Sequence, residues 1–187
     1  MEATSNVMLC GISLFFLGQG SEWFWVMVES IIVIVSLWFI YRQVKLSRYA
    51  NMLQIILKFR EMWNSEEMMR CRQSTCKNYQ RRTEAIGKAE EEVSGFFEEI
   101  GLLVEKHVIP KEFVWECYSY YIEPYWTMMK KNIKKFRQQT HDESWLDHFE
   151  RLRETMRKFS KKRNVPSRDL TAAKIEQFIK GELERIG

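Results

Sequence analysis

The chain has 187 residues, of which 45% are hydrophobic, and its formal net charge is +4. The residues after position 41 are numerous enough for one compact domain with its own core. The four cysteines form no CxxC pair, and the sequence has no Gly-rich phosphate loop, GxSxG or paired-His motif. We therefore expect free thiols, no metal and no cofactor, and the enzyme classes built on those motifs are disfavoured.

The most apolar stretch of the chain covers residues 23–41, and its only charged residue is Glu29. About 20 apolar residues span a hydrocarbon core of roughly 30 Å, and aromatic residues near both ends suit the headgroup region. We predict a transmembrane helix over residues 22–42, preceded by an extracytoplasmic or interfacial segment, residues 1–21. The alternative is a buried helix of a soluble protein, which is usually shorter and less uniformly apolar. A cleaved signal peptide is disfavoured because no basic residue precedes the run and it contains no small-residue cleavage site.

Basic residues set the predicted orientation of this span. No Lys or Arg precedes Arg42, whereas Arg42, Lys45 and Arg48 follow the apolar run directly. The positive-inside rule then places the N-terminus outside and residues 43–187 in the cytoplasm, as a helical domain.

Charge is segregated along the cytoplasmic part. Residues 42–82 contain ten Lys or Arg and three Glu, residues 84–105 contain seven Glu and one Lys, and residues 130–163 contain twelve Lys or Arg and five Asp or Glu. Such blocks suit packing between neighbouring helices, and the basic ones also suit anionic lipid headgroups or RNA. We favour lipid and contacts between subunits over nucleic acid.

Apolar residues recur at helical spacing throughout the cytoplasmic part, and no segment alternates as a strand would, so we predict an all-α bundle. The membrane helix should continue to about Trp63, pause at residues 64–65 and resume to about Arg82. Further helices are expected near residues 93–104, 113–136 (with a kink at Pro124), 145–159 (capped by Asp142 or Ser144) and 175–183 (begun at Ser167 or Asp169).

Four polar residues in and beside the span, Glu22, Glu29, Ser36 and Gln43, are spaced by seven. On a helix this spacing keeps them on one face, with a drift of only about 20° per step. Three explanations are open: a ring of identical helices around a wet lumen, a dry helix–helix contact with a protonated Glu29, or a Glu29 that reaches water at the outer interface. The first two require a homo-oligomer.

One pair of residues suggests chemistry. Arg137 and His141 would share a helical face, and they resemble the signature of the HEPN ribonucleases, an Arg followed after four to six residues by a His. In that mechanism the His acts on a ribose hydroxyl and the Arg stabilises the phosphorane, without a metal. Only three residues intervene here, at least one fewer than in the signature, so the pair is a degenerate form of it. The alternative is that Arg137 pairs with Glu98 or Glu150 inside the bundle.

Four segments together resemble the DUF4760 family of small bacterial proteins, which have an N-terminal membrane helix and a helical cytoplasmic domain. They are FFEEIGLLVEKHVIP, YSYYIEPYW, Arg137 and WLDHFERL. The family's motif residues fall on packing positions and on one ion-pair network of Glu98, Arg137 and Glu150. The packing positions are Phe97, Ile100, Gly101, Trp126 and Phe149.

The layout also resembles the HEPN-like membrane accessory proteins of type VI-B CRISPR systems, which accompany the RNA-guided ribonuclease Cas13b. That resemblance implies a pore in the bacterial inner membrane, assembled from many copies, that enhances antiphage defence. Two other functions are open: a membrane-tethered, metal-independent HEPN ribonuclease, and a passive anchor or scaffold for a partner. The expected partners are further copies of the chain and the lipid bilayer, and RNA is less favoured. The resemblance adds Cas13b as a functional partner, through direct or indirect contact.

Overall fold

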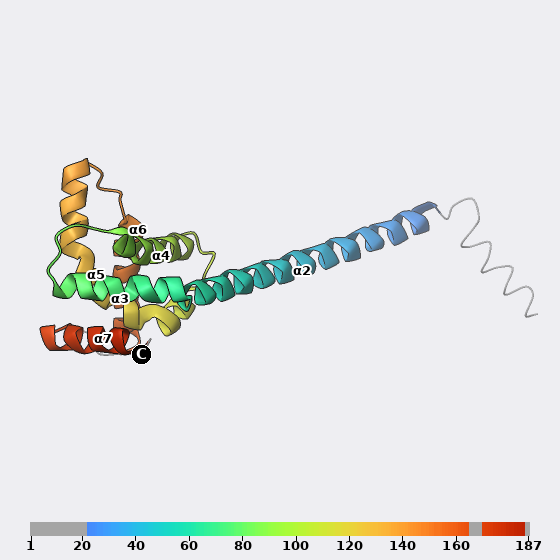
Figure 1. Ribbon diagram of the computed structural model, residues 1–187. Helices are drawn as coiled ribbons and strands as arrows, with labels where there is room; N and C mark the ends of the chain where they lie inside the picture. The colour runs from blue at the N-terminus through green and yellow to red at the C-terminus, as the bar shows by residue number, and fades with distance from the viewer. Residues whose placement is uncertain (1–21, 165–169, 186–187) are drawn as a thin grey trace, which may run out of the picture. The chain divides into compact units, whose positions relative to one another are not determined.

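The computed structural model describes residues 22–164 and 170–185, and every regular element in them is a helix. The predicted all-α class is therefore confirmed. The elements are α2 (Glu22–Trp63), α3 (Glu66–Gln80), α4 (Lys88–Glu105), α5 (Lys111–Thr140), α6 (Asp147–Lys162) and α7 (Ala172–Glu184), as labelled in Figure 1. The expected N-terminal segment, residues 1–21, and the expected starts of the last helix, Ser167 and Asp169, lie outside the described residues.

The chain divides into two compact units, residues 1–51 and residues 52–187. In the first unit all described residues belong to α2, and none of them is buried. The second unit begins within the same helix, whose last two turns supply three buried side chains, Ile56, Phe59 and Trp63. Helix α2 thus has no break near Arg42, as the sequence predicts.

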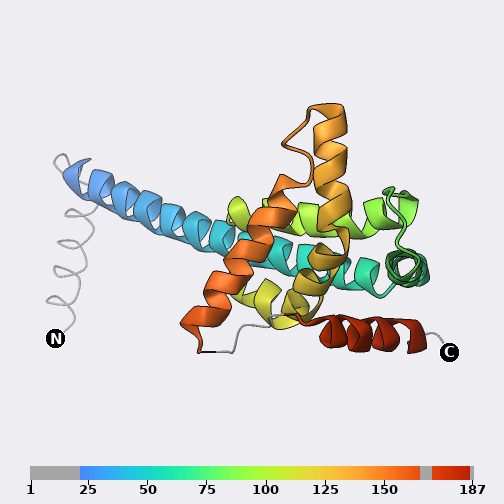
Figure 2. The same cartoon turned by 90° about the vertical axis from the view of Figure 1, so that its left-hand side faces the viewer.

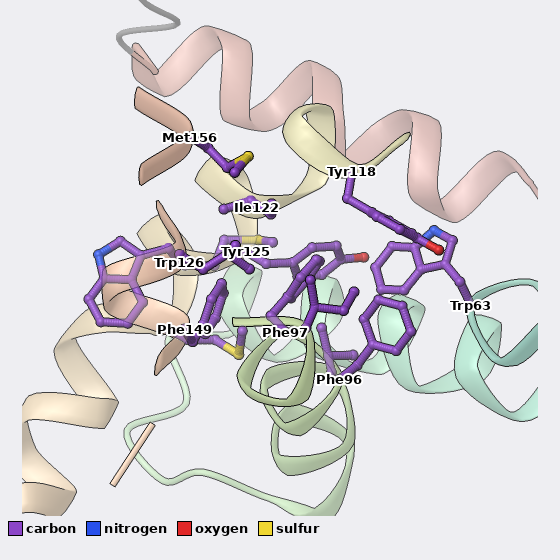
Figure 3. Packing of buried hydrophobic residues seen from close by; sticks show 14 of the residues in the cluster. Trp63, Phe96, Phe97, Tyr118, Ile122, Tyr125, Trp126, Phe149 and Met156 are labelled. Atoms are coloured by element: carbon purple, nitrogen blue, oxygen red, sulfur yellow. The ribbon is translucent and has the colours of Figure 1, made fainter. Parts of the chain in front are cut away.

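The core of the second unit is aromatic. Helix α4 packs against α3 and α6, and α7 lies beside α3 (Figures 1 and 2). Trp63 lies 4.7 Å from Phe96 between ring centroids, and Phe97 stacks on Phe149 at 5.0 Å (Figure 3). Because such pairs add about 0.5–1.5 kcal/mol beyond burial, this cluster fixes α2, α4 and α6 at one place in the core.

The helix ends have identifiable causes. Ser65 caps α3 by accepting a hydrogen bond from the Met68 amide at 3.2 Å, which explains the interruption predicted at residues 64–65. Helix α5 follows Pro110 and continues through Pro124 to Thr140. Pro110 suits this start because its ring fixes φ and no helical partner is needed there.

The predicted caps of α6 are wrong. The helix begins at Asp147 after a left-handed Leu146 with φ of 59°, and not after Asp142 or Ser144. Asp142 instead accepts hydrogen bonds from the amide and hydroxyl of Ser144, at 2.9 and 2.6 Å, which closes a local turn. Two of the first amides of α6 are satisfied by a side chain from another helix, so no side-chain cap at its own N-terminus is needed for them.

Gly101 permits the close approach of α4 and α6. A Cβ built on Gly101 would overlap the backbone carbonyl of His148. Gly95 lies on the same helix, six residues earlier, and a Cβ there would meet nothing within 4 Å. Close packing therefore requires a glycine at position 101, whereas position 95 has room for a larger side chain.

We expect Gly101→Ala to destabilise the bundle by about 1–3 kcal/mol, because backbone atoms cannot yield as a flexible side chain would. Gly95→Ala is the matched control and should stabilise it by about 0.5–1 kcal/mol, because glycine is unfavourable inside a helix. Thermal melting of the full-length protein in detergent, followed by circular dichroism, measures both. Equal effects of the two substitutions would contradict the close contact.

Candidate functional site

The described part of the first unit is an apolar helix on which no other described residue packs. Its most hydrophobic stretch of 18 residues is entirely unburied, and α2 is the one helix in the described residues that is long and apolar enough to cross a membrane. The core helix of a soluble protein would be mostly buried. Large side chains stand in the open along it, including Trp23, Ile34, Phe39 and Leu46, each at least 60% exposed.

The polar stripe predicted from the sequence lies on this helix. Glu22, Glu29, Ser36 and Gln43 are all exposed. Within the described part of the chain, their side chains make no hydrogen bond or ion pair. At about 100° per residue, Ser47 also falls within this face, so the polar face continues about one turn past Gln43. Sequence reasoning missed it because its spacing from Gln43 is four residues, not seven.

The three basic residues that follow the apolar run, Arg42, Lys45 and Arg48, are exposed on the same helix. The Arg42 guanidinium lies over the Trp38 ring, 5.2 Å from its centroid. This contact holds the arginine near the end of the apolar run, where a cation and an indole both suit a membrane interface.

In the second unit, Arg137 is built into the bundle. Its Nε donates to the Trp145 carbonyl at 2.8 Å, and its Nη1 donates to Glu150 at 2.7 Å. The side chain of Arg137 is only 9% exposed and that of Glu150 is 29% exposed, so the ion pair is partly shielded from water. Two of the three guanidinium nitrogens are thus committed to the segment that leads into α6. The third, Nη2, is buried and has no partner within the described residues.

Glu98 holds the same segment from the other side. Its carboxylate accepts hydrogen bonds from the amides of His148 and Phe149, at 3.2 and 2.7 Å. These are among the first amides of α6, which lack a partner within their own helix. Glu98 therefore serves as the cap of α6 from α4, and a carboxylate there also complements the helix dipole. Glu98 and Arg137 are linked through residues 145–150, and no direct ion pair joins them in the described structure.

His141 lies apart from this arrangement. It ends α5 in a left-handed conformation with φ of 55°, and its side chain is exposed. Its backbone amide donates to the Arg137 carbonyl, but no hydrogen bond joins their side chains in the described residues. Because Arg137 faces inward and His141 is exposed at the helix end, the pair does not form a shared pocket for a ribose and a phosphate.

A buried polar network that sequence reasoning missed joins α3, α5 and α7. Arg72 donates two hydrogen bonds to Glu182, both 2.7 Å long, and Tyr125 donates a third at 2.6 Å. The Arg72 guanidinium also lies 4.3 Å from the centre of the Trp63 ring. One signal was available: Glu182 follows Phe178 by four residues, and so lies on the apolar face of the last helix.

Burial and the neighbouring groups together set the pKa values of this network. Burial opposes the charge of Arg72, but Tyr125 and Glu182 outweigh it and raise the pKa of the guanidinium. Burial and the charge of Glu182 raise the pKa of Tyr125 well above its ordinary value. Burial raises the pKa of the neighbouring Cys76 thiol to about 12. The tyrosine and the thiol stay protonated at neutral pH, so neither is an activated nucleophile.

Two cavities lie among the described helices of the bundle. One of about 660 Å³ is lined by residues of α3, α4, α5 and α7 and by the segment after α3, and it contains no His or Cys. Another of about 570 Å³ contains His107 and lies between α4, α6 and the start of α5. Among the described residues, no three His, Cys, Asp or Glu side chains gather in a way that could hold a metal.

A family model described as "Domain of unknown function (DUF4760)" matches residues 26–156, which is more than half of the chain. The chain belongs to the DUF4760 family. The DUF4760 match includes most of the apolar helix and all of the residues discussed around Arg137, but it ends within α6, before α7. Comparisons with curated proteins and with solved structures give no match.

The buried pair predicts a large effect of a single change. Glu182→Ala leaves the buried charge of Arg72 without its carboxylate, and we expect a loss of about 3–5 kcal/mol in stability. The double variant Arg72→Met with Glu182→Leu should recover most of that loss, because apolar residues of similar size can replace a buried ion pair. Thermal melting of the full-length protein measures both.

The matched control is Glu66→Ala, which removes the ion pair with Arg70, where both side chains are 73% exposed. It should barely change the melting temperature, because exposed pairs contribute little. A double variant that melts no higher than Glu182→Ala would show that the network is needed for more than charge compensation.

Proposed function

We propose that this DUF4760 protein is an oligomeric, pore-forming protein of the bacterial inner membrane that acts as an accessory in antiphage defence. The observation that carries the proposal is the polar stripe of Glu22, Glu29, Ser36 and Gln43 along an otherwise apolar helix whose surface is unburied. In this proposal the stripes of several copies face one another around a water-filled path.

The energetic argument starts from Glu29. A carboxylate in the centre of a bilayer costs about 2.5–3.5 kcal/mol on insertion scales, so polar side chains in spans normally face other helices or water. In the described part of the chain, no other residue covers this stripe. A single span cannot enclose a path by itself, and the proposal therefore requires several copies of the chain.

The course of α2 supports a retained span over a cleaved signal sequence. The apolar run does not end at a break, because the same helix continues to Trp63, and Ile56, Phe59 and Trp63 belong to the core of the second unit. Removal of the apolar run would therefore cut inside a continuous helix. Arg42, Lys45 and Arg48 follow the run, which favours an N-terminus outside and a cytoplasmic bundle.

The bundle supports a structural role for Arg137. Its donors hold the Trp145 carbonyl and Glu150, and His141 is exposed at the end of α5. A ribonuclease would need both side chains free to meet one phosphate and one ribose. We therefore rank a membrane-tethered ribonuclease below the pore.

The link to defence rests on resemblance alone. The layout of one span followed by a helical domain, with a degenerate Arg–His pair, is similar to the membrane accessory proteins of type VI-B CRISPR systems. We propose that this protein enhances interference by Cas13b through a change in membrane permeability, which does not require direct contact between the two proteins.

Glu29→Leu tests the role of the stripe. We expect it to change the conductance of the reconstituted protein in planar bilayers severalfold, because one ring of carboxyl groups is lost from the path. Ile31→Leu is the control, because position 31 lies on the opposite side of the helix and the change is conservative. A wild-type protein that is only monomeric in detergent, or an unchanged conductance with Glu29→Leu, would refute the pore. The function that remains would then be a passive membrane anchor.

His141→Ala separates the pore from the enzyme. We expect the variant to assemble, melt and protect against phage as the wild type does, because the side chain is exposed and outside the core. Arg137→Ala should lower the melting temperature because Glu150 loses its partner. RNA cleavage by the purified wild type that disappears in His141→Ala, with assembly intact, would establish the ribonuclease instead.

A further inference from the structure

Four side chains, Trp38, Arg42, Lys45 and Tyr49, occupy one side of α2. They follow one another at spacings of three or four residues, so they form a continuous strip along the helix. At about 100° per residue, the centre of this strip lies about 160° from the centre of the polar stripe. The helix therefore has two opposite faces, one with carboxyl, hydroxyl and amide groups and one with cations and aromatic rings.

The cations of this strip have no acidic neighbour. No Asp or Glu occurs from residue 30 to residue 60, and in the described part of the chain Arg42 and Lys45 form no ion pair. The contact of Arg42 with Trp38, at 5.2 Å, orients the guanidinium but does not neutralise it. The positive charge of this face is therefore not compensated within the described part of the chain, and the face is open to an anionic ligand.

The surroundings of the cations are apolar. The strip borders a shallow, open cleft on the helix surface, whose apolar lining includes Phe39, Tyr41 and Leu46. Trp38 is 52% exposed and Tyr49 is 60% exposed, so both rings are available. A ligand on this face meets hydrocarbon at one end and positive charge at the other.

We propose that Trp38, Arg42, Lys45 and Tyr49 form a binding site for an anionic phospholipid. The guanidinium of Arg42 donates paired hydrogen bonds to the headgroup phosphate, Lys45 adds a point charge, and the Tyr49 hydroxyl donates a further bond. Trp38, one turn closer to the apolar run, packs along the first methylenes of the acyl chains. The amphipathic lining favours a lipid over an RNA backbone, which would meet the cations but leave the apolar wall uncovered.

The site rests on the proposed function only in that α2 lies in a membrane. It does not depend on the pore, because a single helix carries all four residues. In an assembly with the polar stripes inside, this face points outward, so lipid bound here and subunits packed along the stripe do not compete.

The test uses full-length protein in nanodiscs of phosphatidylcholine with a minor fraction of phosphatidylglycerol. Native mass spectrometry after release from the discs counts the lipids retained by each protein. The wild type should retain phosphatidylglycerol in preference to phosphatidylcholine. Arg42→Gln with Lys45→Gln should reduce that preference by about thirty-fold, as expected for two basic residues at an anionic surface.

The matched control is Lys130→Gln with Lys134→Gln, which removes the same charge from exposed positions on α5. It should keep the preference of the wild type. An equal loss in both double variants would overturn the site, because the effect would then be one of total charge. A wild type without lipid preference would overturn it as well.

Two competitors identify the ligand class. Inorganic phosphate or single-stranded RNA in excess should not displace the retained phosphatidylglycerol, and displacement by either would overturn the assignment to lipid. The same spectra report the number of chains in each complex. Monomers that keep their phosphatidylglycerol would refute the pore and support the lipid site, so the two failures are distinguishable.

Discussion

The structure depends on one constraint: none of the described residues covers the apolar surface of the first part of α2. From Glu22 to Asn51 no side chain of the helix is buried, and the bundle of the second unit has its own closed aromatic core. A bare apolar helix of this length is unstable in water, since burial is worth about 25 cal/mol for each Å² of apolar surface. In the proposed function, lipid and further copies of the chain supply the missing contacts.

The two faces of this helix differ in chemistry and so suit different contacts. The face with Glu29 is too polar for acyl chains alone, and the face with Arg42 is too basic to pack against a copy of itself without an anion. The proposed assembly assigns the first face to contacts between subunits and the second to lipid. In the second unit, two side chains hold the start of α6 in place. Glu98 on α4 accepts hydrogen bonds from its first amides, and Arg137 on α5 binds the Trp145 carbonyl and Glu150.

Much of the fold could be predicted from the sequence because its signals are local. The apolar run, the pause at Ser65 and the all-α class follow from composition, capping chemistry and helical periodicity. The start of α6 could not be predicted, because Asp142 and Ser144 have the composition of a cap and the real cap, Glu98, is supplied by a helix about fifty residues away. Contacts between residues so far apart in the chain produce no periodic pattern in the sequence.

The same limit applies to the charged core. Arg72 and Glu182 are 110 residues apart, and their pairing lies outside any window of sequence periodicity. Helix α7 brings the carboxylate into the core, although the family match ends before α7 begins. Arg72 and Glu182 therefore form one buried ion pair in which each side chain compensates the charge of the other. Loss of α7 would remove Glu182 and leave Arg72 as an uncompensated buried charge. We therefore expect a relative without this last helix to have an uncharged residue in place of Arg72.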